Sequence, residues 1–468
     1  MDEPHPTTRQ KALAMNLDAT SYGTIAEIGG GQEVARWFFH VGGAAGTVAK
    51  TISAYDMAVS DALYGATHHY VSRERLEAML AHEYTQLLEQ LGGGRGEQTR
   101  FFAFADTVAT RRYQHPENGR GWLGIWFQAQ PRQAASELLI HVNLFDPSPA
   151  LQQEALGVLG INLIHGVFFH HREPEVLIGS LLDDLSRDRA EVDMIKFSGP
   201  AFSGVDNRLM SLQLVEQALT EAAMFTAAGE VVQPSEVLYK KPVLVERGSF
   251  RPITKVTLDL LERARDRFLQ EPGVHTQEPV VLMEMTLRSL TSEAGLDHAD
   301  FLARADILGG LGMNVLISRF EPYYQLADYL AASTDRMIGI ALGLPSLREI
   351  AHEKYYTDLP GGVIEATGRL FKRSVKIYVY PARDPASGQI YTVENAPMPP
   401  PWQYLRDLLL DIRRLESIRA SSEAYLSIYP QDVLARIQRG DPSWEAMVPP
   451  PVAATIKAEG LFGYRPAR

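Results

Sequence analysis

Short apolar segments between residues 191 and 250 repeatedly end in residues that could bind an anion. A strand that passes through a Gly/Ser loop into a helix presents unpaired backbone N–H groups and a partial positive charge, which favour an anion there. Two basic residues, Lys196 and Arg208, would strengthen such a site. The candidate binding residues of this stretch are Lys196, Ser198, Gly199, Asn207 and Arg208. This chemistry indicates a ligand that carries phosphate or carboxylate groups.

Basic residues recur after the later apolar segments of the sequence. In parallel α/β sheets, ligands bind beyond the carboxyl ends of the strands, so residues just past each strand are candidates for contact. Guanidinium groups bind phosphate or carboxylate through paired hydrogen bonds. The further candidates are Arg247, Arg251, Arg288 and Arg319. Their recurrence in an acidic chain predicts a phosphorylated small molecule or nucleotide as the ligand.

Three carboxylates stand among these basic residues: Asp206, Glu246 and Glu284. Each could hold a divalent metal through oxygen or act as an acid/base group if partly buried. We assign the catalytic and metal-binding roles to Asp206 and Glu284, with Mg²⁺ accompanying a nucleotide as the expected cofactor. The alternative is mutual ion pairing, Glu246 with Arg247 or Arg251 and Glu284 with Arg288.

Apolar strands and amphipathic helices alternate between residues 191 and 380, and these elements must position the candidate residues. Strands are expected at 192–197, 222–226, 243–246, 280–287, 314–318, 338–342 and 375–380. Helices are expected at 209–219, 255–269, 298–311, 323–332, 347–355 and 363–371. Such strands predict an α/β fold with a mostly parallel sheet and helices on both faces, either doubly wound or an irregular barrel.

The rest of the chain predicts an α+β region before this domain and a helical arm after it. Residues 100–108, 121–128 and 137–144 are strand candidates, and the last two alternate as an antiparallel pair would. A charged helix is expected at 402–420. The expected domains are 1–95, mainly helical with Gly-rich loops; 96–185, mixed α+β; 186–385, the α/β ligand-binding domain; and 386–468, a helical, Pro-rich C-terminal arm.

Length and composition exclude several classes of protein. The chain has 468 residues, which predicts two or three domains, and it has no cysteine, which excludes disulfides, thiolate catalysis and zinc–sulfur sites. Its net charge of −12 argues against general nucleic-acid binding. The sequence has no apolar run long enough to span a membrane, and its first twenty residues do not resemble a secretory signal. A cytoplasmic location is therefore expected. Phe462 and Tyr464 of the C-terminal arm could lie on the domain or dock a partner subunit, and the second option predicts a homo-oligomer.

A second ligand hypothesis comes from the segment that ends in Glu27 and continues with Gly29, Gly30 and Gly31. A strand ending in an acid before a Gly-x-Gly loop resembles the first motif of Rossmann-type methyltransferases, and this implies S-adenosylmethionine as cofactor. The alternative is that the glycines form only a turn and a helix cap.

Residues 25–36, 52–56, 194–208, 239–252 and 441–445 resemble those of a largely uncharacterised bacterial protein family. Its members carry the labels nicotinate-nucleotide adenylyltransferase or TonB-dependent receptor, and the resemblance spans nearly the whole chain. The first label implies a nucleotide ligand bound by a Gly-rich loop with His-x-Gly-His and by Ile-Ser-x-Thr-x-x-Arg; residues 166–171 and 317–319 carry only parts of these motifs. The second label implies a secreted membrane barrel, for which the sequence has neither a signal nor the strand pattern.

Two functions follow as hypotheses. The first is a cytoplasmic α/β enzyme that acts on a nucleotide or another phosphorylated metabolite. It would be a transferase of phosphoryl or nucleotidyl groups. The second is a non-catalytic nucleotide-sensing or assembly protein in which the same crevice binds the nucleotide.

Overall fold

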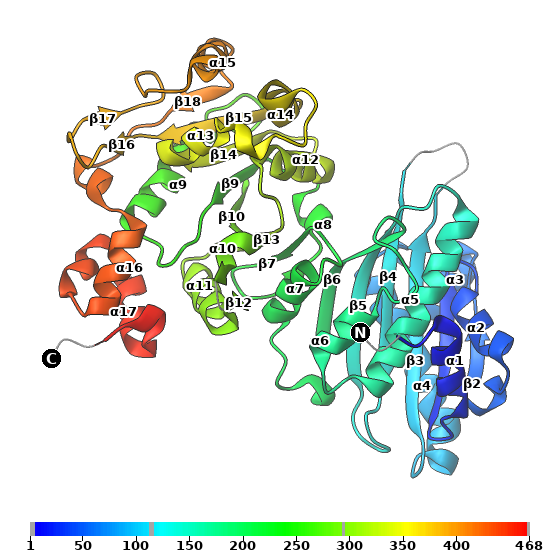
Figure 1. Ribbon diagram of the computed structural model, residues 1–468. Helices are drawn as coiled ribbons and strands as arrows, with labels where there is room; N and C mark the ends of the chain where they lie inside the picture. The colour runs from blue at the N-terminus through cyan, green and yellow to red at the C-terminus, as the bar shows by residue number, and fades with distance from the viewer. Residues whose placement is uncertain (1–4, 112–116, 293–294, 466–468) are drawn as a thin grey trace. The chain divides into compact units, whose positions relative to one another are not determined.

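The computed structural model describes residues 5–111, 117–292 and 295–465 (Figure 1). The chain forms two compact units, Met1–Glu221 and Ala222–Arg468. Each unit is built around its own sheet with helices packed on it, so the prediction of a mixed α/β protein with largely parallel strands is confirmed at this level. None of the helices in the described ranges has the length and apolar character needed to cross a membrane.

The first unit contains a mixed sheet with the order β2-β1-β3-β4-β5-β6. Its strands are β1 (Ser21–Ile28), β2 (Val48–Ile52), β3 (Arg100–Ala109), β4 (Gly119–Phe127), β5 (Ser136–Leu144) and β6 (Ala190–Ser198). β1 is parallel to β2 and β3, whereas β3, β4, β5 and β6 pair antiparallel in succession. The pairing of β1 with β3 places residues 1–95 and 96–185, which we expected to form separate domains, in one sheet.

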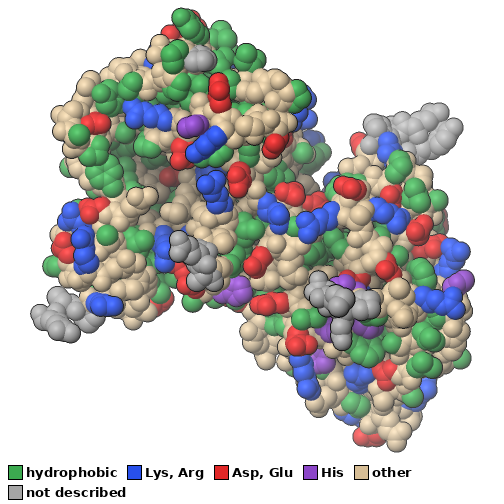
Figure 2. Space-filling model, viewed as in Figure 1, with side chains coloured by type: hydrophobic (Ala, Val, Ile, Leu, Met, Phe, Trp, Pro, Cys, Tyr) green, Lys and Arg blue, Asp and Glu red, His purple; other side chains and the backbone are tan. Residues whose placement is uncertain are grey.

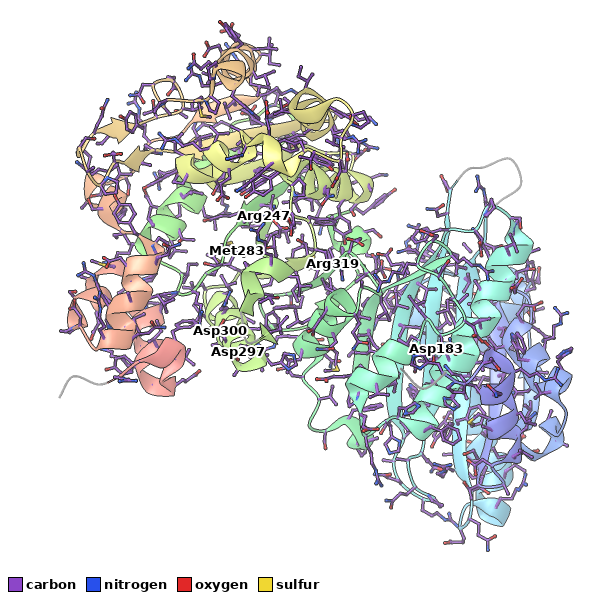
Figure 3. The ribbon with its side chains drawn as sticks, in the orientation of Figure 1. Asp183, Arg247, Met283, Asp297, Asp300 and Arg319 are labelled. Atoms are coloured by element: carbon purple, nitrogen blue, oxygen red, sulfur yellow. The ribbon has the colours of Figure 1, made fainter. Side chains whose placement is uncertain are left out.

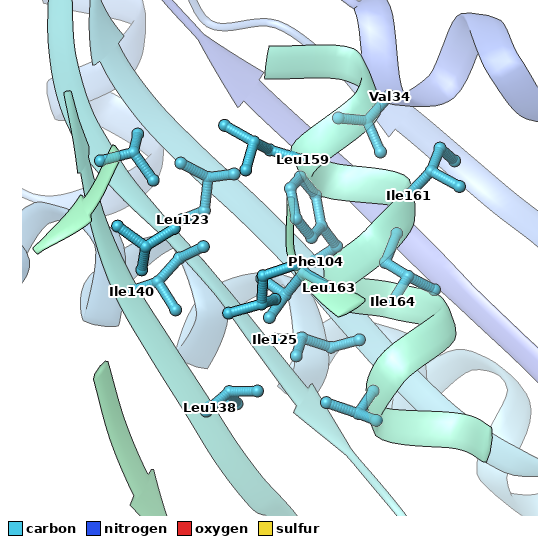
Figure 4. Close-up of a cluster of buried hydrophobic side chains, with 14 of the residues drawn as sticks. Val34, Phe104, Leu123, Ile125, Leu138, Ile140, Leu159, Ile161, Leu163 and Ile164 are labelled. Carbon is cyan, nitrogen blue, oxygen red and sulfur yellow. The ribbon is translucent and has the colours of Figure 1, made fainter. Parts of the chain in front are cut away.

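An apolar core fills one side of this first sheet. The helices of the unit are α1 (Thr8–Leu17), α2 (Glu33–Val41), α3 (Met57–Tyr64), α4 (Arg73–Arg95), α5 (Pro149–Phe169), α6 (Pro174–Ser180) and α7 (Asn207–Glu216). α5 is buried and mostly apolar from Ala155 to Phe168, and Leu159 and Leu163 pack against Phe104 and Ile140 of the sheet (Figure 4). Burial of both faces of the helix explains why it lacks a polar stripe.

The second unit contains a sheet with the order β18-β15-β14-β9-β10-β13-β7-β8. Its strands are β7 (Ala222–Phe225), β8 (Val231–Val232), β9 (Val243–Arg247), β10 (Val280–Thr286), β13 (Asn314–Ser318), β14 (Ile338–Gly343), β15 (Val375–Tyr380) and β18 (Leu415–Ser417). All neighbours from β18 to β13 are parallel. Two short hairpins accompany the sheet, β11 (Thr291–Ser292) with β12 (Gly295–Leu296) and β16 (Ala382–Arg383) with β17 (Ile390–Tyr391).

Three expectations about secondary structure and strand pairing differ from the structure. β6, expected in the parallel sheet, pairs antiparallel with β5 in the first unit, and the boundary between the units falls inside the range 186–385. β7 is antiparallel to β13. The helix expected at 402–420 ends at Asp411, and residues 415–417 form the edge strand β18 because Leu415 packs into the core of the sheet. In each case a tertiary neighbour decided what local pattern left open.

Helices cover both faces of the second sheet. They are α8 (Pro234–Leu238), α9 (Lys255–Phe268), α10 (Leu287–Leu290), α11 (His298–Gly310), α12 (Tyr323–Ser333), α13 (Leu344–Ile350), α14 (Gly362–Leu370) and α15 (Pro400–Asp411). Val243 and Val245 of β9 share a core with residues of α12, α13, α14 and α15. Leu244, which points to the opposite face, lies with Phe268 of α9 beside Gly339. α9 therefore packs on the opposite face from α12–α15.

The C-terminal residues form a small helical cluster. It comprises α16 (Pro430–Arg439), α17 (Pro450–Glu459) and the 3₁₀ turns η5 (Pro442–Met447) and η6 (Leu461–Gly463). Phe462, which we expected to lie on the domain or on a partner subunit, is buried within the chain. Trp444 is buried too, and its ring meets that of Tyr464 edge to face at 6.0 Å.

Candidate functional site

The strand order of the second unit reverses between β9 and β14. The chain passes from β9 outward through β10 to β13, then returns to β14 on the other side of β9 and continues outward through β15 to β18. This is the order of doubly wound nucleotide-binding sheets, in which ligands lie beyond the carboxyl ends of the strands where the order reverses. The candidate site therefore comprises the loop at 248–254, the start of α9 and the residues that follow β14.

Arg247 and Glu284 form a buried ion pair at this edge of the sheet. Nε and one terminal nitrogen of Arg247 lie 2.6 and 2.8 Å from the two carboxylate oxygens of Glu284. Ser318 donates its hydroxyl to Oε1 of Glu284 at 2.5 Å, and the guanidinium lies 4.4 Å from the centre of the Tyr323 ring. Burial, above all, raises the pKa of Tyr323 to about 12. Both oxygens of Glu284 are thus engaged by the protein itself.

The loop after β9 is held from α11. Arg304, which is buried, donates to the backbone carbonyl of Ser249 at 3.0 Å and to that of Ser289 at 3.1 Å. It also pairs with Asp300, whose other oxygen lies 2.6 Å from Nε of Arg251. Figure 3 shows Asp300 on α11 and Arg247 at the end of β9. One buried arginine therefore connects the loop after β9 with the short helix that follows β10.

Backbone donors are available at the start of α9. Thr254 caps the helix because its Oγ1 accepts the N–H of Thr257, at 3.4 Å. The carbonyl of Thr254 accepts the N–H of Leu258. The N–H groups of Lys255 and Val256 have no acceptor among the described residues. The first turn can therefore donate to an anion.

Glu246 directly precedes Arg247 on β9, but its side chain has a different environment. Its side chain is 5% exposed, and its Oε2 has no hydrogen-bond partner in the described part of the chain. Its register neighbours on β10 and β14 are Met283, labelled in Figure 3, and Ala341. Desolvation by these apolar surroundings raises the pKa of the Glu246 carboxyl well above its ordinary value. The expected pairing of Glu246 with Arg247 or Arg251 is absent among the described contacts.

Comparisons with known proteins give only distant similarity. No family model and no curated protein matches the chain. A competence/damage-inducible protein from Agrobacterium tumefaciens is similar at 15% identity and a TM-score of 0.25, over 35% of this chain and 97% of that one. CinA superfamily proteins from Enterobacter cloacae and Klebsiella pneumoniae 700603 reach 10% and 11% identity, each with a TM-score of 0.26, over 36% and 35% of this chain and 96% of each of theirs. These TM-scores are too low to support any transfer of fold or function.

The remaining candidates on the second sheet have other surroundings. Arg288 is exposed, and its nearest acid is Glu321 at 3.5 Å, so the expected pair with Glu284 does not form. Arg319 is half-buried directly after β13 (Figure 3). The structure thus brings Arg247 and Glu284 together and gives Arg251 and Arg288 separate acidic partners.

The candidates between residues 196 and 208 belong to the first unit. Ser198 donates to Glu137 at 3.0 Å, and the Asn207 side chain bonds both backbone groups of Phe197. Gly199 has φ 91°, and a Cβ there would lie 2.7 Å from Cα of Ser136, so only glycine fits. These polar groups hold the connection from β6 to α7. Lys196 is half-buried on β6.

Asp206 caps α7 and binds Arg208. Its side chain accepts the N–H of Arg208, and Arg208 also donates to it from the guanidinium at 2.8 Å. Burial raises the pKa of this carboxyl, but the hydrogen bonds from Arg208 outweigh it and leave the pKa below its ordinary value. Asp206 and Glu284 thus each engage an arginine, and the described residues contain no cluster of three or more His, Asp or Glu side chains that would suit a metal. Because arginines already bind these carboxylate oxygens, the expected Mg²⁺ site at Asp206 and Glu284 does not fit the residues as they are arranged.

Two further features bear on the choice of site. A cavity of about 780 Å³ lies near the amino ends of β14 and β15, where four basic and three acidic side chains line it. Lys376 there binds Glu271 at 2.5 Å and Glu416 at 2.6 Å. On the face seen in Figure 2, basic side chains are mixed with acidic ones. The cavity lies at the amino edge, whereas doubly wound sheets bind ligands beyond the carboxyl ends of their strands, so the carboxyl edge is the better candidate.

Sequence reasoning missed three of the residues that shape this edge: Thr254, Asp300 and Arg304. Thr254 had a readable signal, because a threonine directly before a predicted helix is a preferred N-cap. Arg304 had none, since an arginine in an amphipathic helix normally reaches solvent.

Proposed function

We propose that this protein binds a nucleotide or another phosphorylated metabolite at the carboxyl edge of the second sheet and transfers a phosphoryl or nucleotidyl group from or to it. The observation that carries the proposal is the reversal of strand order between β9 and β14, with the N-terminus of α9 at that point. The ligand's phosphates bind the free N–H groups of Lys255 and Val256 and the Lys255 ammonium. The nicotinate-nucleotide adenylyltransferase activity named by the family resemblance is one specific form of this reaction. We place the protein in the cytoplasm.

The arginines and carboxylates have distinct roles in this proposal. Because Arg247 is locked to Glu284, this pair fixes the ends of β9 and β10 and does not donate to the ligand directly. Arg251 lies in the loop that approaches the phosphates. Asp300, which pairs with both Arg251 and Arg304, helps to hold this loop. Any Mg²⁺ would be bound through the phosphates of the nucleotide.

The proposal is tested by binding measurements on the full chain. A panel of nucleoside triphosphates, dinucleotides, sugar phosphates, nicotinate mononucleotide and S-adenosylmethionine is screened by thermal shift with and without Mg²⁺. A ligand at 100 times its Kd adds about 2.7 kcal/mol of stability. We expect Lys255→Ala to weaken phosphate binding about 10-fold, whereas Lys241→Ala, an exposed lysine before β9, should not. Absence of any shift with phosphorylated compounds would reject the proposal.

A second candidate is a non-catalytic nucleotide sensor. It is favoured by the ion pairs of Glu284 with Arg247 and of Asp206 with Arg208, because both carboxylates are already bound by the protein. It predicts nucleotide binding without turnover, and ³¹P NMR of the mixture distinguishes the two. The methyltransferase alternative has less support, since the Glu27 carboxylate accepts the N–H groups of Val34 and Ala35 at 2.9 and 3.1 Å and so caps α2.

A further inference from the structure

The Glu246 carboxyl is a buried polar group that lacks a partner. It lies between Met283 and Ala341 in the sheet, and no described residue donates to or accepts from its Oε2. Native proteins leave few buried polar groups unsatisfied, and those that remain often await a ligand, an ion or a water molecule. Its neighbour Arg247 does not relieve it, because that side chain points to the opposite face and binds Glu284.

The direction of α9 places the start of that helix at the same edge of the sheet as Glu246. Near the end of α9, Phe268 meets the Tyr378 ring at 6.2 Å, and near its beginning Asp259 accepts the hydroxyl of Tyr380. Since Tyr378 precedes Tyr380 on β15, α9 runs antiparallel to the strands and its first turn lies at their carboxyl ends. Glu246 shares the α9 face of β9 with Leu244 and is one residue from the end of the strand. Glu246 and the first turn of α9 therefore lie on the same face of the sheet, at its carboxyl edge.

Two kinds of binding group then lie on one face at the carboxyl edge of the sheet. The N–H groups of Lys255 and Val256 and the Lys255 ammonium are donors for an anion. Glu246 is an acceptor in a dry, apolar setting, where a hydrogen bond is strong and discrimination against a ligand without the matching group is large.

We propose that Glu246 is a specificity-determining residue that accepts a hydrogen bond from an amino or hydroxyl group of the ligand, while the N-terminus of α9 binds the same ligand's phosphate. The ligand class is then a nucleoside phosphate and not a simple polyphosphate. This inference rests on the proposed nucleotide site and adds the residue that reads the nucleoside.

The test compares ligands that share phosphates but differ in the nucleoside. The four ribonucleoside triphosphates and inorganic tripolyphosphate are titrated into the full chain by isothermal titration calorimetry. We expect the preferred nucleotide to bind the parent protein at least about 10-fold more tightly than tripolyphosphate. In Glu246→Met the nucleotide should lose that advantage while tripolyphosphate binds as before. Glu246→Gln keeps a carbonyl acceptor and should retain part of the preference.

Controls separate recognition from folding. Glu262→Gln removes an exposed carboxylate of α9 and should leave both affinities unchanged. Glu246→Met removes an unpaired buried group, so its melting temperature should equal or exceed that of the parent protein. If Glu246→Met fails to fold, Glu246→Gln serves as the deciding variant.

The outcomes are distinct. A parent protein that binds neither nucleotides nor tripolyphosphate rejects the nucleotide site and this inference together. A parent protein that binds a nucleotide, with Glu246→Met and Glu246→Gln equal to it in affinity and preference, overturns the role of Glu246 alone.

Discussion

Arg247 and Glu284 face each other across the parallel strands β9 and β10, joined by two guanidinium–carboxylate hydrogen bonds of 2.6 and 2.8 Å. The pair lies at the carboxyl edge of the second sheet, and Ser318 of β13 binds the same carboxylate. Three strands are thereby fixed relative to one another beneath the proposed ligand.

Breaking this pair should destabilise the second unit strongly. Arg247→Met leaves a fully buried carboxylate without its cation, so we expect a loss of about 3–5 kcal/mol in the free energy of unfolding. The double variant Arg247→Met/Glu284→Leu should recover most of it, because no charge then stays buried. Urea denaturation, monitored by hydrogen exchange in β9 and β10, measures the stability of the single and the double variant. Arg265→Met, in an exposed pair with Glu278, should change stability by less than about 1 kcal/mol.

The first unit should lose stability as the pH rises. Glu27 and Asp106 are register neighbours on β1 and β3; burial raises the pKa of Glu27 to about 7 and that of Asp106 well above its ordinary value. Because these folded-state pKa values exceed the unfolded ones, the contribution is complete below the unfolded pKa and is lost as the pH rises through the folded pKa.

Between pH 5 and pH 8 we expect the unfolding free energy of the first unit to fall by about 1–3 kcal/mol more in the parent protein than in Asp106→Asn. That variant removes one acid and keeps an acceptor for the N–H of Ile28. Hydrogen exchange in β1 and β3 at several pH values provides the measurement. The exposed Asp188→Asn is the matched control, and identical pH profiles for parent and Asp106→Asn would contradict the prediction.

Replacing Arg304 should loosen the loop after β9. Arg304→Met removes the donors to the carbonyls of Ser249 and Ser289, so amide exchange at 248–254 should accelerate about 10-fold or more. Nucleotide affinity should fall with it, since the loop no longer stays in place. Arg336→Met, an exposed arginine paired with the adjacent Asp335, serves as control. Unchanged exchange in the loop would show that α11 does not hold it.

The aromatic residues of the C-terminal cluster should stabilise their own unit. Trp444 is 1% exposed, so Trp444→Ala should cost about 3–5 kcal/mol in the stability of that cluster and open it to proteolysis. Tyr404→Ala, at an exposed position of α15, should have little effect.

Sedimentation of the parent protein and of a chain lacking residues 441–468 tests the proposed homo-oligomer. Equal sedimentation behaviour of the two would argue against an assembly role for the arm.

Local pattern in the sequence was sufficient to predict many elements of the second unit. Residues 314–318 and 375–380 were predicted as strands and form β13 and β15 with those bounds, because a buried parallel strand is a short apolar run between polar residues. The occurrence of Arg or Lys just past several strands was equally readable.

Tertiary structure alone decided which of these residues meet. Glu284 binds Arg247, 37 residues away, and not the nearby Arg288, because β9 and β10 are adjacent in the sheet. The assignment of β6 to the first sheet and the isolation of Glu246 depend likewise on strand order and register. The sequence determined the period and polarity of each segment, which are local properties; pairing between distant strands follows from non-local hydrogen bonds and packing, which no single segment encodes.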